Sequence, residues 1–314
     1  MSQIWKIILV FISILALGLA AFTENKKNAV QESILPQAYE QYYQTEGPLE
    51  DMYTRKGSYA VASLTAPSDH SAIKNIRIFY PAELSESEKR YPMILVVNGS
   101  NTPAAVYQPY FERLASWGFI VVGNDDPQTG NGESASLTLD YMLNESAFRD
   151  SIDPASLGLV GYSQGGAGAL NLVTRHENGR LFKAVFTGSA AYPLLAENMG
   201  WGYDPESIAI PYFMTAATGE SDDRNVADIN AEFAGVAPLQ SLMDIYDAMP
   251  DDVLKVRGRC VGAEHTDMIL RTDGYMTAWM LYHLQGDEEA GKVFLGENAE
   301  ILFNANWQDV KVGK

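Results

Sequence analysis

Short apolar runs alternate with amphipathic stretches along most of this chain, and this alternation limits the folds that it can adopt. Residues 92–98 and 119–123 are continuous apolar runs, as expected of strands that are buried on both faces. Residues 107–117 lie between them, carry apolar side chains at helical spacing and are followed by Gly118. The three segments therefore predict a βαβ unit, in which a helix joins two parallel strands.

The same cycle repeats toward the C-terminus, and an alternating pair of segments precedes it. Residues 58–65 and 73–80 alternate apolar and polar side chains, which predicts two antiparallel strands at the start of the sheet. Further strands are predicted at residues 157–162, 182–187, 211–216 and 253–261. Further helices are predicted at residues 137–149, 165–175, 239–249 and 275–284. We therefore expect an α/β fold, with a central, mostly parallel, twisted sheet and helices on both faces.

The N-terminus differs from the rest of the chain because it contains one long uncharged apolar run. Lys6 precedes this run, which covers residues 7–22, and polar residues follow it. Gly18 and Ala20 fit the two small-residue positions of a signal-peptidase site. Residues 1–22 are therefore predicted to be a signal peptide, with an uncleaved N-terminal membrane anchor as the alternative.

The pattern changes twice after this segment. Residues 23–46 are polar with little periodicity and are predicted to be a linker or an N-terminal arm, and residues 47–314 are predicted to form one folded domain. This organisation predicts a secreted, extracytoplasmic or cell-surface location. Contact with a membrane is expected only through the N-terminal segment, if that segment stays uncleaved.

The composition removes several classes of partner and cofactor. The chain has 22 Lys and Arg against 40 Asp and Glu, a formal net charge of -18, so it lacks the positive surface that nucleic-acid binding needs. Its single cysteine, Cys260, allows no intrachain disulfide and no cysteine zinc site, and it is expected to be a buried small residue. No cofactor is implied, and the acidic loops show no ordered spacing of calcium ligands.

One serine lies in a turn that is typical of a nucleophile. Residues 161–165 are Gly-Tyr-Ser-Gln-Gly, between a predicted strand and a predicted helix, and in this context the G-x-S-x-G pattern indicates a strained turn that exposes the serine hydroxyl. Ser163 is then the candidate nucleophile, and the N–H of Gln164 at the start of the helix can face a developing oxyanion. The alternative is a glycine-rich turn that packs the helix closely on the strand.

A serine nucleophile needs a general base, and the chain has four histidines. His70 lies in a polar loop before the central strands, His176 ends the helix after the candidate nucleophile, and His283 lies inside a predicted amphipathic helix. His265 stands in a polar loop directly after a predicted strand, so it can reach the C-terminal edge of the sheet. His265 is therefore the predicted base, and His283 is the alternative.

The acid that orients the base is expected in the loop after the strand at residues 211–216. Asp222 is preferred to Asp223 and Glu220, because the order nucleophile, acid, base along the chain accompanies this kind of serine turn. One-residue offsets within a loop leave these three carboxylates open as candidates.

The second oxyanion donor is expected in the turn after the first parallel strand. Gly99 permits a close turn there, and the backbone N–H of Ser100 is the predicted donor. The alternative is an ordinary strand-to-helix turn without a role in chemistry.

These motifs resemble those of a known group, the secreted cutinase-like polyester hydrolases, which include the bacterial poly(ethylene terephthalate) hydrolases. More distantly, the chain resembles the dienelactone-hydrolase-type esterases. The likeness runs from about Gly47 to the C-terminus. It rests on the motifs at residues 91–100, 113–119, 153–166, 219–222, 245–249, 262–265 and 278–280. The resemblance implies an α/β-hydrolase catalytic domain over residues 47–314 and a carboxylic-ester hydrolase that works through an acyl-enzyme intermediate.

Carried over residue by residue, the resemblance implies the same roles as the residues themselves. Ser163 would be the nucleophile, Asp222 the acid and His265 the base, with the backbone N–H groups of Ser100 and Gln164 as the oxyanion hole. The implied substrate is a small-molecule, lipid or polymeric ester.

The chain departs from this group around the pocket. Residues 98–100 are Asn-Gly-Ser where the group has a Pro-Gly-aromatic turn, so the aromatic clamp for an aromatic acyl group is missing and polymer activity does not carry over. Tyr162 and Tyr192 are the candidate pocket residues, and Gln164 makes the pocket floor more polar. An extra stretch at residues 225–237 is predicted to form a small lid or rim.

Other functions use the same residues. A serine peptidase or an acyltransferase needs the same triad, because amine and alcohol departure follow the same chemistry. A non-catalytic surface binding protein on a hydrolase scaffold is the alternative from another class, and it does not require all three triad candidates.

Overall fold

A computed structural model describes residues 35–36, 39, 43–86 and 88–313. The predicted signal peptide or anchor at residues 1–22 lies outside the described residues, as does most of the predicted arm at 23–46. Among the described residues, no helix combines the length and the apolarity that crossing a bilayer requires.

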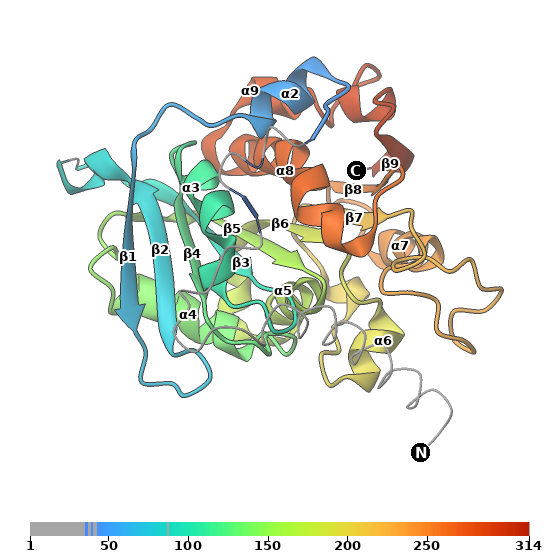
Figure 1. The fold of residues 1–314 in the computed structure, drawn as a ribbon, viewed down its shortest axis with the longest axis horizontal. Coiled ribbons are helices and arrows are strands. Elements are labelled where there is room, and N and C mark those ends of the chain that lie inside the picture. The colour runs from blue at the N-terminus through green and yellow to red at the C-terminus, as the bar shows by residue number, and fades with distance from the viewer. Residues whose placement is uncertain (1–34, 37–38, 40–42, 87, 314) are drawn as a thin grey trace.

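The described residues form one nine-stranded sheet, in the order β1-β2-β4-β3-β5-β6-β7-β8-β9, with β1 at the left and β9 at the right in Figure 1. The strands are β1 (Val61–Pro67), β2 (Asn75–Pro81), β3 (Tyr91–Val97), β4 (Ile120–Asn124), β5 (Ile152–Tyr162), β6 (Phe182–Gly188), β7 (Tyr212–Ala217), β8 (Lys255–Cys260) and β9 (Trp307–Gly313). The pairs β1/β2, β2/β4 and β8/β9 are antiparallel, and the other five neighbouring pairs are parallel. The predicted α/β fold class is confirmed.

The helices cover both faces of the sheet. They are α2 (Pro48–Thr54), α3 (Gln108–Ala115), α4 (Glu133–Asn144), α5 (Gln164–Arg175), α6 (Pro193–Asn198), α7 (Leu239–Ala248), α8 (Met268–Gln285) and α9 (Glu288–Gly291). Short 3-10 helices include η4 (Glu177–Leu181) and η6 (His265–Asp267). In β3, Ile94 and Val96 face a core completed by α3 and α8, whereas Met93 and Leu95 face a core completed by α4, α5 and α7. Both faces of β3 are therefore buried, which explains its continuous apolar run.

Some elements differ from the expected ones. Helix α4 begins four residues before the predicted start and ends at Asn144, and α8 begins at Met268, seven residues before its predicted start at 275. The first turns of α8 contain Arg271 and Asp273, whose polar side chains hide the helical pattern in the sequence. Strand β9 was not predicted, because it is an edge strand in which Trp307 is buried and the other residues are partly buried or exposed.

Part of the predicted N-terminal arm lies in the core. Tyr39 is buried, and its hydroxyl donates to Asp273 Oδ2 at 2.7 Å. Arg113 of α3 donates from Nε to the same hydroxyl at 3.0 Å and forms an ion pair with Asp273 of α8. Arg113 and Asp273 are both fully buried, so this cluster joins the arm to the two helices on one face of the sheet.

Candidate active site

The predicted nucleophile lies in a tight turn between β5 and α5. Ser163 is the N-cap of α5, and its backbone has a φ of 57°, in the left-handed region. A Cβ at Gly165 would lie 2.1 Å from the carbonyl oxygen of Val97, and one at Gly161 would lie 2.3 Å from that of Gly165. Because the backbones approach this closely, the two glycines are required, as expected of a strand-to-helix turn that exposes its serine.

Two backbone N–H groups near this turn are unengaged. Gly99 donates its N–H to the hydroxyl of Tyr107 at 3.1 Å. Within the described residues, no hydrogen-bond acceptor receives the N–H of Ser100 or that of Gln164. Gln164 is the first residue of α5, so its N–H also lies at the positive end of the helix dipole. These are the two donors that the sequence singled out for an oxyanion.

The predicted base and acid are in contact. His265 starts η6 after β8, and Asp222 lies in the loop after β7. The distance from His265 Nδ1 to Asp222 Oδ1 is 2.6 Å. The Asp222 side chain is fully buried, whereas 12% of the His265 side chain is exposed. The imidazole is therefore held by a buried carboxylate on one side and keeps some access to solvent.

The second carboxylate oxygen of Asp222 has two donors of its own. Oδ2 accepts the N–H of Ala217 at 2.7 Å and the hydroxyl of Ser189. Ser189 was not among the predicted site residues. Its only signal in the sequence is its place directly after the strand at β6, at the C-terminal edge of the sheet where the other candidates lie.

Charges around His265 set its proton affinity. Burial lowers the pKa of the imidazole, but the neighbouring carboxylates of Asp222 and Glu264 and the hydrogen bond to Asp222 outweigh it, so the pKa is raised above 6.5. A raised pKa makes the neutral imidazole a stronger base once it is deprotonated.

The nucleophile turn and the histidine loop are linked through the end of β6. The N–H of Ser163 donates to the carbonyl oxygen of Gly188 at 3.0 Å. A Cβ at Gly188 would lie 3.6 Å from Cβ of Met268, which directly follows η6. Within the described part of the chain, the Ser163 hydroxyl makes no hydrogen bond to His265, a contact that often closes only when substrate binds.

The other acidic candidates are placed elsewhere. Asp223 forms an ion pair with Arg259 at 2.7 Å and accepts the N–H of Leu239 at the start of α7. Glu220 is exposed. Of the three carboxylates that the sequence left open, the structure brings Asp222 to the histidine.

The other histidines lie away from the turn. His283 is near the C-terminal end of α8, with its ring 4.2 Å from that of Trp279, and burial lowers its pKa to about 4. His176 is at the far end of α5, where its Nε2 lies 3.1 Å from the carbonyl oxygen of Asn131. His70 is exposed. The structure therefore brings His265, and not His283, to the candidate acid.

Tyr162 does not line an open pocket, contrary to the prediction. Its ring packs edge-on against Tyr110 and Phe186, and its hydroxyl lies 3.3 Å from that of Tyr110 and 3.4 Å from that of Thr272. Residues alternate across the sheet, so the side chain at this position points into the core below the turn. Tyr192, the other pocket candidate, lies beside the extra stretch, and its hydroxyl donates to the carbonyl oxygen of Ile229 at 3.3 Å.

A chain of amides lies beside the nucleophile. The side chain of Gln164 accepts the N–H of Thr129 at 3.2 Å and donates to Gln128 at 3.0 Å. Gln128 in turn donates to Asn101 at 3.4 Å. These bonds form a network that joins the start of α5 to two loops at one edge of the sheet.

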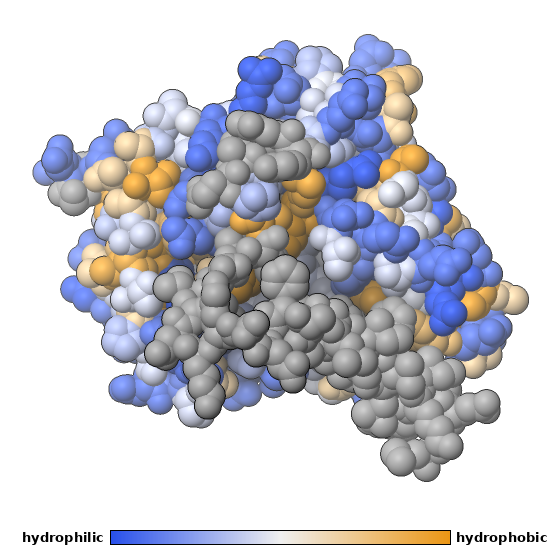
Figure 2. All heavy atoms as spheres, in the orientation of Figure 1, coloured by the Kyte–Doolittle hydropathy of each residue, from blue (hydrophilic) through white to orange (hydrophobic). Residues whose placement is uncertain are grey.

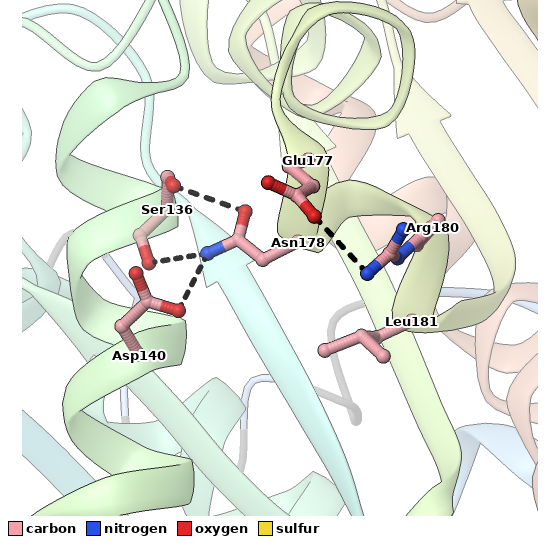
Figure 3. A pocket seen from close by; sticks show the side chains of 6 residues that line it. All are labelled: Ser136, Asp140, Glu177, Asn178, Arg180 and Leu181. Atoms are coloured by element: carbon pink, nitrogen blue, oxygen red, sulfur yellow. Dashed lines mark hydrogen bonds and ion pairs between the residues drawn. The ribbon is translucent and has the colours of Figure 1, made fainter.

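Two other features of the molecule take no part in this site. The pocket in Figure 3 lies between α4 and η4, at the end of α5 away from Ser163, and its Asn178 bonds to Ser136 and Asp140. Cys260 is buried, and burial raises the pKa of its thiol, so it is not available as a thiolate nucleophile.

The face of the molecule shown in Figure 2 is mainly polar. In the view of Figure 2, most described residues are hydrophilic, and hydrophobic side chains gather in smaller areas between them. The formal net charge of -18 opposes the approach of anionic molecules. Neutral and cationic ligands meet no such barrier.

Known proteins are similar in sequence to part of this chain. The PET hydrolase-like family model matches residues 38–192, a range that contains Ser100 and Ser163. Cutinase 2 of Thermobifida cellulosilytica is 26% identical over 196 residues, which cover 60% of this chain and 64% of that protein. Cutinase cut1 of Thermobifida fusca is also 26% identical, over 60% of this chain and 52% of that protein.

A further relative is named for a different ester substrate. The bis(hydroxyethyl) terephthalate hydrolase of Streptomyces coelicolor is 27% identical over 183 residues, which cover 56% of this chain and 54% of that protein. The matches thus span between about half and two thirds of these relatives. By its sheet, its serine turn and these matches, the chain has an α/β-hydrolase fold and is similar to the cutinase-like, polyester hydrolase-type proteins.

Proposed function

We propose that this chain is an exported serine hydrolase of carboxylic esters, with Ser163 as nucleophile, His265 as general base and Asp222 as the acid that orients the base. The 2.6 Å contact between His265 and the buried carboxylate carries the proposal, because that contact fixes the imidazole tautomer. The left-handed turn at Ser163 supports it, since strain in a non-glycine residue is common at functional sites.

Acylation follows from this arrangement. The Ser163 hydroxyl attacks the ester carbonyl carbon, and Nε2 of His265 takes its proton. The electron pair of the C=O bond moves to oxygen, where the N–H groups of Ser100 and Gln164 stabilise the negative charge. When the C=O bond reforms, the bond to the alcohol breaks, and the alcohol leaves with the proton held by His265. Asp222 stabilises the imidazolium between these steps.

Deacylation repeats the chemistry with water. His265 takes a proton from a water molecule, whose oxygen attacks the acyl carbon of the acyl-enzyme. Collapse of the second tetrahedral intermediate releases the carboxylic acid and returns the proton to the oxygen of Ser163. No step needs a cofactor.

The substrate is proposed to be a neutral ester with a small or medium acyl group. The similarity to cutinases and to a bis(hydroxyethyl) terephthalate hydrolase supports ester chemistry. The polar network around Gln164 and the acidic surface favour an uncharged substrate with polar groups near the acyl side. Residues 225–237 are proposed as a rim over the site, and residues 1–22 as the export signal.

The first test is hydrolysis of p-nitrophenyl esters with acyl chains from two to sixteen carbons. The chain without residues 1–20 is compared with its Ser163→Ala variant, and both are treated with a fluorophosphonate that labels activated serines. We expect hydrolysis that falls by at least about a thousandfold in the variant, and labelling of the unmodified chain alone.

The other outcomes have distinct meanings. If Ser163 is labelled but no ester is hydrolysed, the nucleophile is active and the proposed substrate class is wrong. If neither labelling nor hydrolysis occurs in a folded chain, the proposed enzymatic function is wrong, and a binding protein on this scaffold takes its place.

A further inference from the structure

The short turn at residues 188–191 contacts both the nucleophile and the acid. The carbonyl oxygen of Gly188 accepts the N–H of Ser163 at 3.0 Å, and the N–H of Ala191 donates to the carbonyl oxygen of Ser163 at 3.4 Å. Between them, Ser189 donates its hydroxyl to Asp222. One turn of the chain therefore ties the backbone of the nucleophile to the carboxylate of the acid.

The charge of Asp222 depends on this turn. Its side chain is fully buried, and within the described residues no lysine or arginine pairs with it. A buried carboxylate without a cation has to be stabilised by hydrogen-bond donors. Oδ1 contacts His265, while Oδ2 has the N–H of Ala217 and the hydroxyl of Ser189. Without the hydroxyl, one donor would remain on Oδ2 and the carboxylate could rotate away from the imidazole.

The backbone of Ser189 indicates that its hydroxyl, and not its conformation, accounts for the residue type. Its φ is 50°, in the left-handed region that glycine adopts without strain. Its N–H donates to the carbonyl oxygen of Thr215 at 2.8 Å, a bond that glycine could also make. A serine at this position is disfavoured by its backbone, so the side chain has to supply something that glycine lacks.

We infer that Ser189 is a positioning residue that holds the Asp222 carboxylate in line with His265, and that the turn at residues 188–191 sets the nucleophile and the acid relative to each other. The inference rests on the proposed function. It adds a fourth side chain to the site, one that touches neither substrate nor reacting atoms.

The variants Ser189→Ala and Ser189→Gly separate a positioning role from a structural one. Both remove the hydroxyl, but glycine relieves the left-handed strain that alanine keeps, so the glycine variant should melt at the higher temperature. Thr187→Val is the matched control, because Thr187 is a buried residue of β6, two positions before Ser189, and its hydroxyl lies 2.6 Å from that of Tyr212.

The measurements are kcat and KM for a p-nitrophenyl ester, the rate of fluorophosphonate labelling and the melting temperature. We expect kcat and the labelling rate to fall about tenfold in both Ser189 variants, with KM unchanged, because a hydrogen bond to a buried charge is lost. Thr187→Val should keep the kcat of the unmodified chain. The loss of activity would then correlate with the loss of the Ser189 hydroxyl and not with the melting temperature of the variants.

A Ser189→Gly variant with unchanged kcat and labelling rate would overturn the inference, as would a loss seen only in KM. This failure is distinct from failure of the proposed function, which requires that the unmodified chain shows no Ser163-dependent hydrolysis. If the chain labels at Ser163 but hydrolyses none of the esters, the labelling rates alone decide the role of Ser189. Absence of both reactions would overturn the inference together with the function.

Discussion

Two buried carboxylates of this molecule are stabilised in different ways. Asp273 is surrounded by Arg113 and Tyr39, and its charge is neutralised by a guanidinium that is itself fully buried. Asp222 is equally buried, but among the described residues no lysine or arginine pairs with it, and its titratable partner there, His265, is partly exposed. Both side chains belong to the core by burial, yet only one of them has a partner whose charge can change.

The difference separates a stabilising cluster from a reactive one. In the Asp273 cluster the buried carboxylate is paired with a buried guanidinium, so removing one partner is expected to lower the stability of the folded state. In the Asp222 cluster the charge is left available to stabilise a proton on His265, which is the state that a general base passes through. Each prediction below alters one cluster and is expected to leave the property served by the other unchanged.

The largest expected effect is that of Asp222→Asn. An asparagine favours the wrong imidazole tautomer, so kcat should fall by about a factor of 10³ to 10⁴. The melting temperature should change little, because a buried carboxylate that is paired with no lysine or arginine among the described residues is replaced by an amide of the same shape. Steady-state kinetics and thermal unfolding measure both, and a variant that kept more than a tenth of the activity would contradict the proposed role.

The opposite pattern is expected for Arg113→Met. This change leaves Asp273 buried without its cation, so the free energy of unfolding should fall by about 3 to 5 kcal/mol, as measured by urea denaturation. The kcat per folded molecule should stay within about twofold of the original. The double variant with Asp273→Leu is the control, and it should recover much of the lost stability because no unpaired charge remains. A double variant no more stable than the single one would argue against this explanation.

A smaller change is expected for Tyr39→Phe. The ring is kept, but Arg113 and Asp273 each lose one hydrogen bond. The free energy of unfolding should fall by about 1 to 2 kcal/mol, with no change in kcat. An unchanged free energy of unfolding would mean that the phenol hydroxyl adds nothing to the ion pair.

The smallest effect is the pH dependence that His265 introduces. Its raised pKa means that kcat/KM should rise with pH through a value above 6.5, as the imidazole loses its proton. The stability that the same group contributes changes with pH in the opposite direction. It is fully present below the unfolded pKa and is lost as the pH rises through the folded pKa. In activity and stability profiles measured between pH 5 and 9, kcat/KM should therefore rise while the stability contributed by His265 falls. Asp222→Asn should move both transitions to lower pH.

Much of the sheet could be predicted from the sequence, because its central strands are buried on both faces and appear as continuous apolar runs. Because strands in βαβ units are parallel, residues that follow them, such as Ser163 and His265, lie at the C-terminal edge of the sheet. Strand β9 escaped prediction because it is an edge strand with one buried residue, Trp307. The first turns of α8 escaped prediction for a different reason. Their polar residues are satisfied by tertiary partners, such as Tyr43 lying against Arg271, that a local pattern does not contain.

The candidate site was predictable to the extent that chain order and loop position restrict it. Two contacts distant in the chain distinguish Asp222 from Asp223, because His265 contacts Asp222 and Arg259 of β8 pairs with Asp223. Ser189 had no motif around it, because its role depends on a contact 33 positions along the chain. Tyr162 was misplaced, since the sequence shows that it adjoins the nucleophile but not the side of the sheet to which it points.

The buried phenol of Tyr39 limits how far the N-terminus can be trimmed. A signal peptidase that cuts after Ala20 would leave this side chain in the mature protein, whereas a shortened chain that begins at Gly47 would lose it. The shorter form would carry an aromatic-sized hole next to a charged pair, and water would enter there. The folding unit thus reaches upstream of α2 at least as far as Tyr39, and an expression design that follows the sheet alone would miss this residue.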